Sequence, residues 1–221
     1  PRIAYRETIT APAEGHHRHK KQTGGAGQFG EVYLRIVPLA RGAGFEFEDA
    51  VVGGTIPRNF MPAIHKGVRQ AMDAGAVAGY PLQDVKVTVY DGKHHPVDSK
   101  EVAFVTAARK AFLDAVGKAR PVVLEPVVRI EVTVPATCVG DIAGDLSSRR
   151  GRVSGTATPS ADTAVLSGEV PTAELRDYTA RLKALTGGVG SYTIELGGYE
   201  PVPARVQQEL AAVWRPVAEE A

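Results

Sequence analysis

The sequence has little cysteine and no long apolar segment. Its single cysteine, Cys138, excludes an internal disulfide and fits a reducing compartment. No apolar run approaches the roughly 18 to 20 residues of a membrane-spanning helix, and no signal-peptide pattern opens the chain. We therefore expect a cytoplasmic protein that does not contact a membrane. Because Pro1 is not a natural start residue, we also expect a piece of a longer chain.

The motifs that would accompany a nucleotide-binding loop are missing as well. Residues 25–30 (GAGQFG) match G-x-G-x-x-G, a pattern that dinucleotide-binding proteins and protein kinases use to hold phosphates. A dinucleotide site needs a helix after the third glycine. Here Val32, Leu34 and Ile36 alternate with other residues, which predicts a strand. The lysine strand, H-R-D and D-F-G of kinases and the G-x-x-x-x-G-K-[ST] of P-loops do not occur, so a nucleotide-binding enzyme is the least favoured class.

A basic run precedes this glycine-rich loop and suggests that the loop faces phosphate. Residues 16–21 read HHRHKK. Residues 1–121 contain 17 Lys and Arg against 12 Asp and Glu, whereas residues 122–221 contain 9 against 13. The basic first half favours a nucleic acid as its partner, although a chance distribution of charge over a solvated surface would look similar.

Histidines cluster in the same region and raise the question of a metal site. The chain has six histidines, and five of them are at positions 16, 17, 19, 94 and 95. Zinc sites usually add cysteine or carboxylate ligands at a defined spacing. Cys138 is remote in sequence and the neighbouring residues are Arg and Lys, so we expect no metal.

Periodicity divides the chain near residues 119–121. In the first half, Ile64, Val68 and Met72 indicate one helix, and a second is expected from Asp98, as its N-cap, to about Lys118. Strands are expected in this half over residues 3–9, 31–37, 44–51 and 83–90.

The second half predicts the order β-α-β-β-α-β of ferredoxin-like domains. Its strands are expected over residues 126–134, 152–157, 163–170 and 191–196, with helices carrying Val139 to Leu146 and Leu175 to Leu185. Asp141 and Asp145 are four residues apart on the first of these helices, which we interpret as a solvated face. Residues 204–214 predict a further helix that packs back onto one of the domains.

Several short segments follow one another along residues 1–203 in an order that is specific when they are taken together. They include 5–9 (YRETI), 22–30 (QTGGAGQFG), 44–47 (GFEF), 79–81 (GYP), 91–92 (DG), 97–99 (VDS), 124–126 (LEP), 140–142 (GDI) and 149–151 (RRG). Together these segments resemble the two C-terminal domains, the fourth and fifth, of bacterial elongation factor G. The sequence of residues 19–25 (HKKQTGG) is closer to the elongation-factor-G-like paralogue branch than to the housekeeping factor.

The resemblance implies an α+β protein of two domains. Residues 1–121 would form a fourth-domain-like unit of the ribosomal-protein-S5-domain-2-like kind, and residues 122–203 a ferredoxin-like fifth domain. Residues 204–221 would form a C-terminal helix and tail. It also implies a monomer that binds the ribosome, with rRNA and the tRNA–mRNA duplex of the decoding site as partners.

The implied role is to hold that duplex during translocation, with no catalytic site and no cofactor in this chain. The longer parent is expected to be a ribosome-dependent GTPase that binds GTP and Mg²⁺ in N-terminal domains missing here. The alternative is a ribosome- or RNA-binding paralogue that does not translocate.

In that family two loops lie side by side at the far end of the fourth domain, and here they correspond to residues 22–30 and 91–98. Glycines let such a loop approach an RNA minor groove, where shape, 2′-hydroxyls and phosphates are recognised. Arg149 and Arg150, at the end of a helix, either contact rRNA or only complement the helix dipole. The candidate RNA-binding residues are Arg18, Lys20, Lys21, Gln22, Gly24, Gly25, Gln28, Lys93, His94, His95, Arg149 and Arg150.

The chain departs from the housekeeping factor at several of these places. Ala26 replaces a residue that is usually basic at the loop tip, and Gly187 and Val189 replace Gln and Arg. Each change removes a polar contact, which weakens the expected binding to RNA without abolishing it.

Overall fold

The computed structural model describes residues 2–22 and 24–218, so Thr23 of the first loop and Pro1 lie outside the described residues. The chain forms two compact units. The N-terminal unit contains residues 6–123 and 202–218, and the C-terminal unit contains residues 124–201 together with residues 2–5. The second unit is therefore inserted, in chain order, between two parts of the first.

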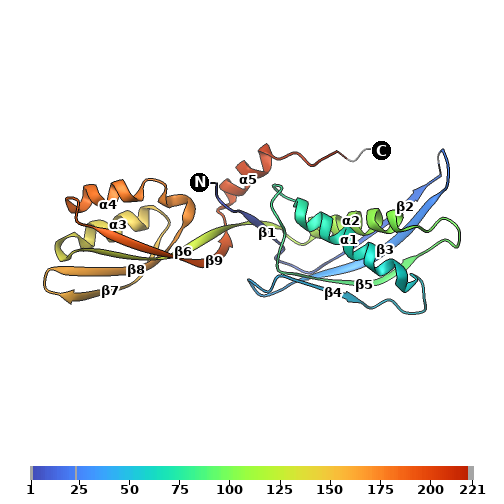
Figure 1. Ribbon diagram of the computed structural model, residues 1–221, viewed down its shortest axis with the longest axis horizontal. Helices are drawn as coiled ribbons and strands as arrows, with labels where there is room; N and C mark the ends of the chain where they lie inside the picture. Colours follow the sequence, from blue (N-terminus) through green and yellow to red (C-terminus); the bar gives the residue numbers. More distant parts are fainter. Residues whose placement is uncertain (1, 23, 219–221) are drawn as a thin grey trace. The chain divides into compact units, whose positions relative to one another are not determined.

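The N-terminal unit is a four-stranded sheet covered on one face by two helices (Figure 1). The strands follow the order β2-β3-β5-β4, with β4 parallel to β5 and the other pairs antiparallel. β1 pairs with β6, whose first two residues belong to this unit. The elements are β1 (Arg6–Thr8), β2 (Ala13–Lys21), β3 (Gln28–Pro38), β4 (Phe45–Asp49), a 3-10 turn (Arg58–Phe60), α1 (Met61–Ala74), β5 (Val85–Lys93), α2 (Glu101–Lys118) and α5 (Ala204–Val213).

Alternating apolar residues place this core between the sheet and the helices. Val32, Leu34 and Ile36 on β3 are fully buried, as are Phe104 and Phe112 on α2. They belong to one hydrophobic cluster, which also holds the predicted apolar stripe of α1. Fully burying a side chain of this size contributes about 1.5 to 3 kcal/mol, so the cluster fixes the sheet that carries the first loop.

The C-terminal unit has the ferredoxin-like order that the sequence predicts. Its sheet follows β9-β6-β8-β7 with every pair antiparallel, and α3 and α4 cover one face (Figure 1). The predicted fold class is therefore confirmed. The elements are β6 (Val122–Pro135), a 3-10 turn (Ala136–Cys138), α3 (Val139–Ser148), β7 (Arg152–Ser160), β8 (Thr163–Pro171), a 3-10 turn (Thr172–Leu175), α4 (Tyr178–Thr186) and β9 (Ser191–Pro201).

Helix α5 returns to the N-terminal unit after the C-terminal unit is complete. The Gln207 side-chain oxygen accepts a hydrogen bond from the Val123 N–H at 3.1 Å, and its amide nitrogen donates to the Pro121 carbonyl oxygen at 3.3 Å. The Trp214 indole lies so close to Gly79 that an added Cβ there would clash with its ring nitrogen. The expected helix packs back onto the first unit and ends at Val213, one residue early.

In the first half one strand was not predicted and one helix start was wrong. Residues 16–21, noted only as a basic run, belong to strand β2 (Ala13–Lys21). The second helix begins at Glu101 with Lys100 as its N-cap, not at Asp98. The backbone of Asp98 is held elsewhere, because its carbonyl oxygen accepts the Phe29 N–H at 2.8 Å and its N–H donates to the His95 ring at 3.1 Å. Within the part of the chain described, no helix is both long and apolar enough to cross a membrane.

Candidate RNA interface

The first glycine-rich loop is the end of the β2–β3 hairpin. The last cross-strand pair joins Lys21 to Gln28, so the basic run forms one strand of the hairpin rather than a flexible lead-in. Gly24 and Gly25 have φ angles of 74° and 156°, which residues with a Cβ atom rarely adopt. The turn therefore depends on glycine at these positions, which leaves its backbone uncovered by side chains.

The second loop, after β5, is tied to this hairpin by the backbone of Phe29. The Phe29 N–H donates to the Asp98 carbonyl at 2.8 Å, and the Ser99 hydroxyl donates to the Phe29 carbonyl at 3.0 Å. Gly27 lies so close that a Cβ there would come within 2.7 Å of the Asp98 carboxyl group. The structure thus brings residues 22–30 and 91–98 together, and we call them the tip loops.

His95 has a defined tautomer within the second tip loop. Its Nδ1 accepts hydrogen bonds from the Val97 N–H at 3.2 Å and the Asp98 N–H at 3.1 Å. The same nitrogen lies 3.7 Å from the Asp98 carboxylate, but it cannot donate to that group while it accepts two N–H bonds. The shorter backbone contacts prevail, so the proton is on Nε2. The side chain is 50% exposed and offers this N–H as a donor.

Gln28 and His94 also have fixed partners at the tip. The Gln28 side-chain oxygen lies 2.9 Å from His19 Nε2, which leaves the Gln28 amide nitrogen as a donor. His94 Nδ1 lies 3.0 Å from the Thr55 carbonyl oxygen, to which it donates. Lys93 is the last residue of β5 and is paired with Glu31 across the sheet, so it belongs to a strand rather than to the expected loop.

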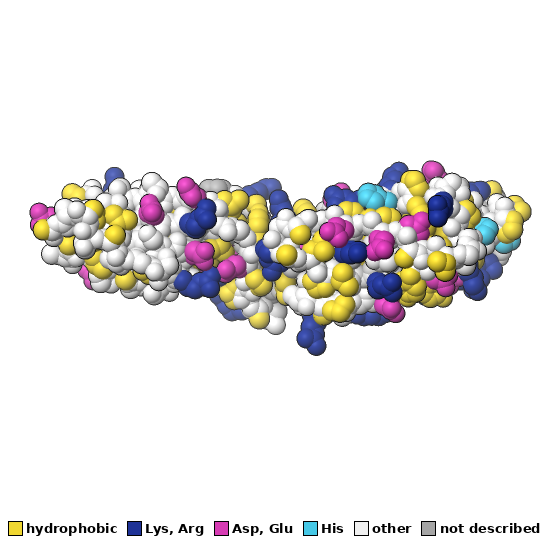
Figure 2. Space-filling view, turned by 90° about the horizontal axis from the view of Figure 1, so that it is seen from below, with side chains coloured by type: hydrophobic (Ala, Val, Ile, Leu, Met, Phe, Trp, Pro, Cys, Tyr) yellow, Lys and Arg dark blue, Asp and Glu magenta, His cyan; other side chains and the backbone are white. Residues whose placement is uncertain are grey.

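Basic side chains at the tip are not neutralised by any carboxylate in the described part of the chain. Among the described residues, no ion pair involves Arg18, Lys20, Lys21 or Lys93. The Arg18 guanidinium lies 5.3 Å above the Phe29 ring, which orients the charge without cancelling it. Figure 2 shows histidine and basic side chains near the end of the N-terminal unit where Figure 1 places the tip loops.

A pocket of about 470 Å³ is lined by most of the predicted site residues of this unit. Phe29 and Asp98 also line it, and the sequence analysis missed both as site residues. The sequence could have identified both, because Phe29 lies within the glycine motif and Asp98 within the segment 97–99 that carries the family resemblance. Seven predicted residues line this pocket: Arg18, Lys20, Gln22, Gln28, Lys93, His94 and His95.

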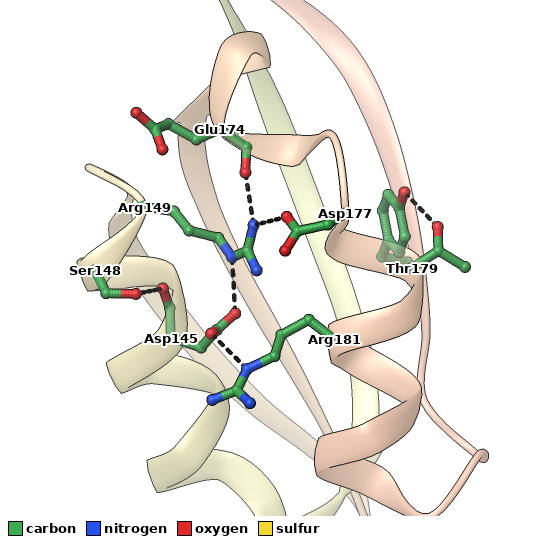
Figure 3. A network of polar contacts seen from close by, with 8 residues as sticks. Asp145, Ser148, Arg149, Glu174, Asp177, Thr179 and Arg181 are labelled. Atoms are coloured by element: carbon green, nitrogen blue, oxygen red, sulfur yellow. Dashed lines mark hydrogen bonds and ion pairs between the residues drawn. The ribbon is translucent and has the colours of Figure 1, made fainter.

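Arg149 and Arg150 belong to the other unit and have a different environment. Arg149 Nε donates to Asp145 at 2.9 Å, and its terminal nitrogen donates to Asp177 at 2.8 Å and to the Glu174 carbonyl oxygen at 2.7 Å (Figure 3). Its side chain is only 11% exposed. Burial alone would lower the pKa of the guanidinium, but the hydrogen bonds to Asp177 and Asp145 raise it. Arg149 is therefore a structural link between α3 and the segment before α4.

Arg150 is paired just as completely. It contacts Glu125 at 2.5 Å and Glu174 at 2.9 Å, and the hydrogen bonds to Glu125 raise the pKa of its guanidinium. Its φ of 59° shows a left-handed backbone that a non-glycine residue adopts only under constraint. A phosphate that approached this pair would compete with carboxylates already in place. RNA contact by Arg149 and Arg150 stays a prediction.

The network also corrects the interpretation of Asp145. Its side chain is 8% exposed, and its second oxygen accepts from Arg181 at 3.1 Å (Figure 3). The expected solvated face therefore does not include Asp145.

No group of three or more His, Cys, Asp or Glu in the described part of the chain is arranged to hold a metal ion.

Comparisons with known proteins agree with this architecture. The family model described as elongation factor G, domain IV, matches residues 1–120, and the one described as elongation factor G C-terminus matches residues 122–210. The chain is 47% identical over 210 residues to an elongation factor G-like protein of Thermotoga maritima, which covers 95% of this chain and 31% of that protein.

A crystal structure of a Thermus thermophilus protein is also similar. It superposes with a TM-score of 0.82 at 42% sequence identity, and the match covers 96% of this chain and 31% of that one. The chain thus spans about a third of the length of both proteins. The resemblance seen in the sequence is confirmed: the chain belongs to the elongation factor G family, of which it carries domain IV and the C-terminal domain.

Proposed function

We propose that this chain is the ribosome-binding, tRNA–mRNA-contacting part of a translation factor that promotes translocation. The observation that carries the proposal is the group of cations around the tip pocket that pair with no described carboxylate, beside loops that expose glycine backbone. Phosphates attract such cations, whereas a site for a small acidic ligand would bury them. The family membership supports the ribosome as the source of the RNA.

The tip loops would hold an RNA duplex without reading its sequence. Backbone N–H groups of the loop at Gly24 and Gly25, together with the Gln28 amide and His95 Nε2–H, are donors that suit 2′-hydroxyl, sugar and phosphate oxygens. Arg18 and Lys20 would neutralise neighbouring phosphates. A factor that advances every codon needs this kind of contact, because base-specific hydrogen bonds would favour some codons over others.

The parent protein would supply the chemistry. We propose that GTP and Mg²⁺ bind in domains outside this chain, on the family resemblance alone, and that the tip loops contain no catalytic group. The closing contact between Phe29 and the Asp98–Ser99 segment keeps the loops in one arrangement, so that binding does not have to order them first.

A second function is favoured by one specific observation. Ala26 stands where the housekeeping factor usually has a basic residue, and the similar Thermotoga protein is named elongation factor G-like. A paralogue that binds the ribosome without translocating would fit both facts.

Toeprinting of pre-translocation ribosomes with the intact parent and GTP separates the two functions. We expect a three-nucleotide advance, slowed at least about tenfold in a Gln28→Ala/His95→Ala variant, since two donors to the duplex are lost. Ser191→Ala, an exposed change in the C-terminal unit, is the matched control. Ribosome binding without any advance would refute translocation and leave the paralogue.

A further inference from the structure

The face of the N-terminal sheet that is not covered by helices carries aromatic side chains. Residues of β3 alternate across the sheet, and Val32, Leu34 and Ile36 point into the helix-covered core. Tyr33 and the other intervening residues therefore point to the open face. Phe29, at the tip end of the same strand, lies on this face and lines the tip pocket.

Rings from three neighbouring strands contact one another on this face. His16 of β2 stacks on Tyr33 with centroids 4.1 Å apart and planes inclined by 24°. Tyr90 of β5 lies 6.2 Å from Tyr33 on the other side, and the Arg35 guanidinium lies 5.1 Å above Tyr90. We call His16, Tyr33 and Tyr90 the ring row.

The ring row lies along the strand that enters the tip. Tyr33 is four residues from Phe29, a distance of about 13 Å along a strand. A stacked nucleic acid strand covers that distance with about four nucleotides. Phe29 contacts both Arg18 and the ring of His95, which lies 6.4 Å away. A strand held at the tip cations could thus continue along β3 onto the rings.

Carboxylates beside the ring row are already bound to neighbours. Glu31 is buried and contacts His16 at 2.7 Å and the Tyr33 hydroxyl at 3.3 Å. Glu14 hydrogen-bonds to Tyr90, and Asp91 accepts the Gly92 N–H at 2.8 Å. Phosphates are therefore repelled by Glu14 and Asp91 on this part of the face, where Arg35 is the neighbouring cation. His16 is exposed and Tyr33 and Tyr90 are partly exposed, so bases can reach their rings.

We propose that the ring row binds unpaired bases of a single RNA strand that continues from the tip pocket. This rests on the proposed RNA binding at the tip and extends it from the backbone of a duplex to the bases of one strand. Stacking tolerates any base, because every base has a π face. It therefore adds affinity without choosing a sequence.

Binding of the 221-residue chain to three RNAs tests the proposal. They are an unstructured strand of about 12 nucleotides, an abasic strand of the same length, and a duplex of the same length, each measured by fluorescence anisotropy at fixed salt. Replacing both tyrosines, in Tyr33→Leu/Tyr90→Leu, should weaken binding to the base-carrying strand about tenfold or more. Affinity for the abasic strand and for the duplex should stay within about twofold.

Conservative variants separate stacking from folding. Tyr33→Phe/Tyr90→Phe keeps the rings and loses both hydroxyls, so it should bind the single strand as the unchanged chain does. Tyr199→Leu, on β9 of the other unit, is the matched control for loss of a tyrosine. Thermal unfolding of each variant identifies any general loss of structure, and a leucine variant that unfolds is replaced by Tyr90→Leu alone.

The outcomes distinguish this proposal from the function proposed for the tip. If the leucine variant binds all three RNAs as before, or loses affinity equally for all, the ring row is not a base-binding site. If Arg18→Ala/Lys20→Ala/Lys93→Ala leaves every RNA affinity unchanged but the leucine variant loses affinity only for the base-carrying strand, the tip proposal fails and the ring row stands.

Discussion

Two groups of basic residues in this chain look alike in sequence and differ in their surroundings. Lys20 and Lys93 at the tip are exposed and have no ion pair with any described residue, whereas Arg149 and Arg150 each contact carboxylates from other elements. A cation exposed to solvent and a cation that links elements of the fold differ only in what lies around them. Basic residues in a motif therefore indicate an interface only when nearby carboxylates do not already bind them.

The largest effect is expected when the carboxylate at the centre of the C-terminal network is removed. Asp145→Ala leaves Arg149, which is 11% exposed, without the more buried of its two carboxylate partners and removes a partner of Arg181. We expect the free energy of unfolding to fall by about 3 kcal/mol, as for other largely buried ion pairs that lose one partner. Urea unfolding measures this change.

Asp141→Ala on the same helix is the control for this variant. Asp141 is exposed, so its removal should change the free energy of unfolding by less than about 0.5 kcal/mol. Equal effects of the two substitutions would show that the network does not stabilise the unit.

A salt titration tests whether the cations at the tip contact phosphate. Lys20→Ala should reduce the slope of log K against log salt concentration for duplex RNA by about 0.7 to 0.9, the contribution of one phosphate contact. Lys183→Ala, an exposed lysine on α4, should leave the slope unchanged. An unchanged slope in the Lys20 variant would mean that this lysine faces no phosphate.

The smallest effect is expected at the exposed end of the arginine network. The hydrogen bond to Arg149 holds the pKa of Asp177 below its usual value. Its contribution to stability is therefore complete above the unfolded pKa of about 3.9 and is lost as the pH falls through the lower folded value. Asp177→Asn should lower the melting temperature slightly at neutral pH, and the difference from the unchanged chain should shrink as the pH falls below about 4. A difference that is constant with pH would exclude the ion pair as its cause.

The sequence predicts the elements whose apolar residues repeat regularly. Val32, Leu34 and Ile36 identified β3, and the order of the second half identified the ferredoxin-like fold. Strand β2 was not predicted because Gly15 is its one buried residue: an added Cβ there would clash with the Ala111 carbonyl oxygen on α2. Most residues of β2 are polar, so the strand has no alternation of apolar and polar residues that would reveal it in the sequence.

Most residues that line the tip pocket could be named from the sequence, but the contacts between them could not. Family resemblance, rather than periodicity, placed residues 22–30 beside residues 91–98. The bonds from Phe29 to Asp98 and Ser99 join residues about 70 positions apart, and this is why Asp98 was mistaken for a helix N-cap. Asp145 was misinterpreted for the same reason, because Arg181 comes from another helix and no local spacing reveals it.

The return of α5 to the N-terminal unit has a consequence for synthesis of the chain. Gln207 contacts residues 121 and 123, and Trp214 lies against Gly79, so the first unit lacks part of its packing until these last residues have been made. The inserted unit, residues 124–201, needs none of them. During translation the C-terminal unit can therefore reach its final packing before the N-terminal unit does.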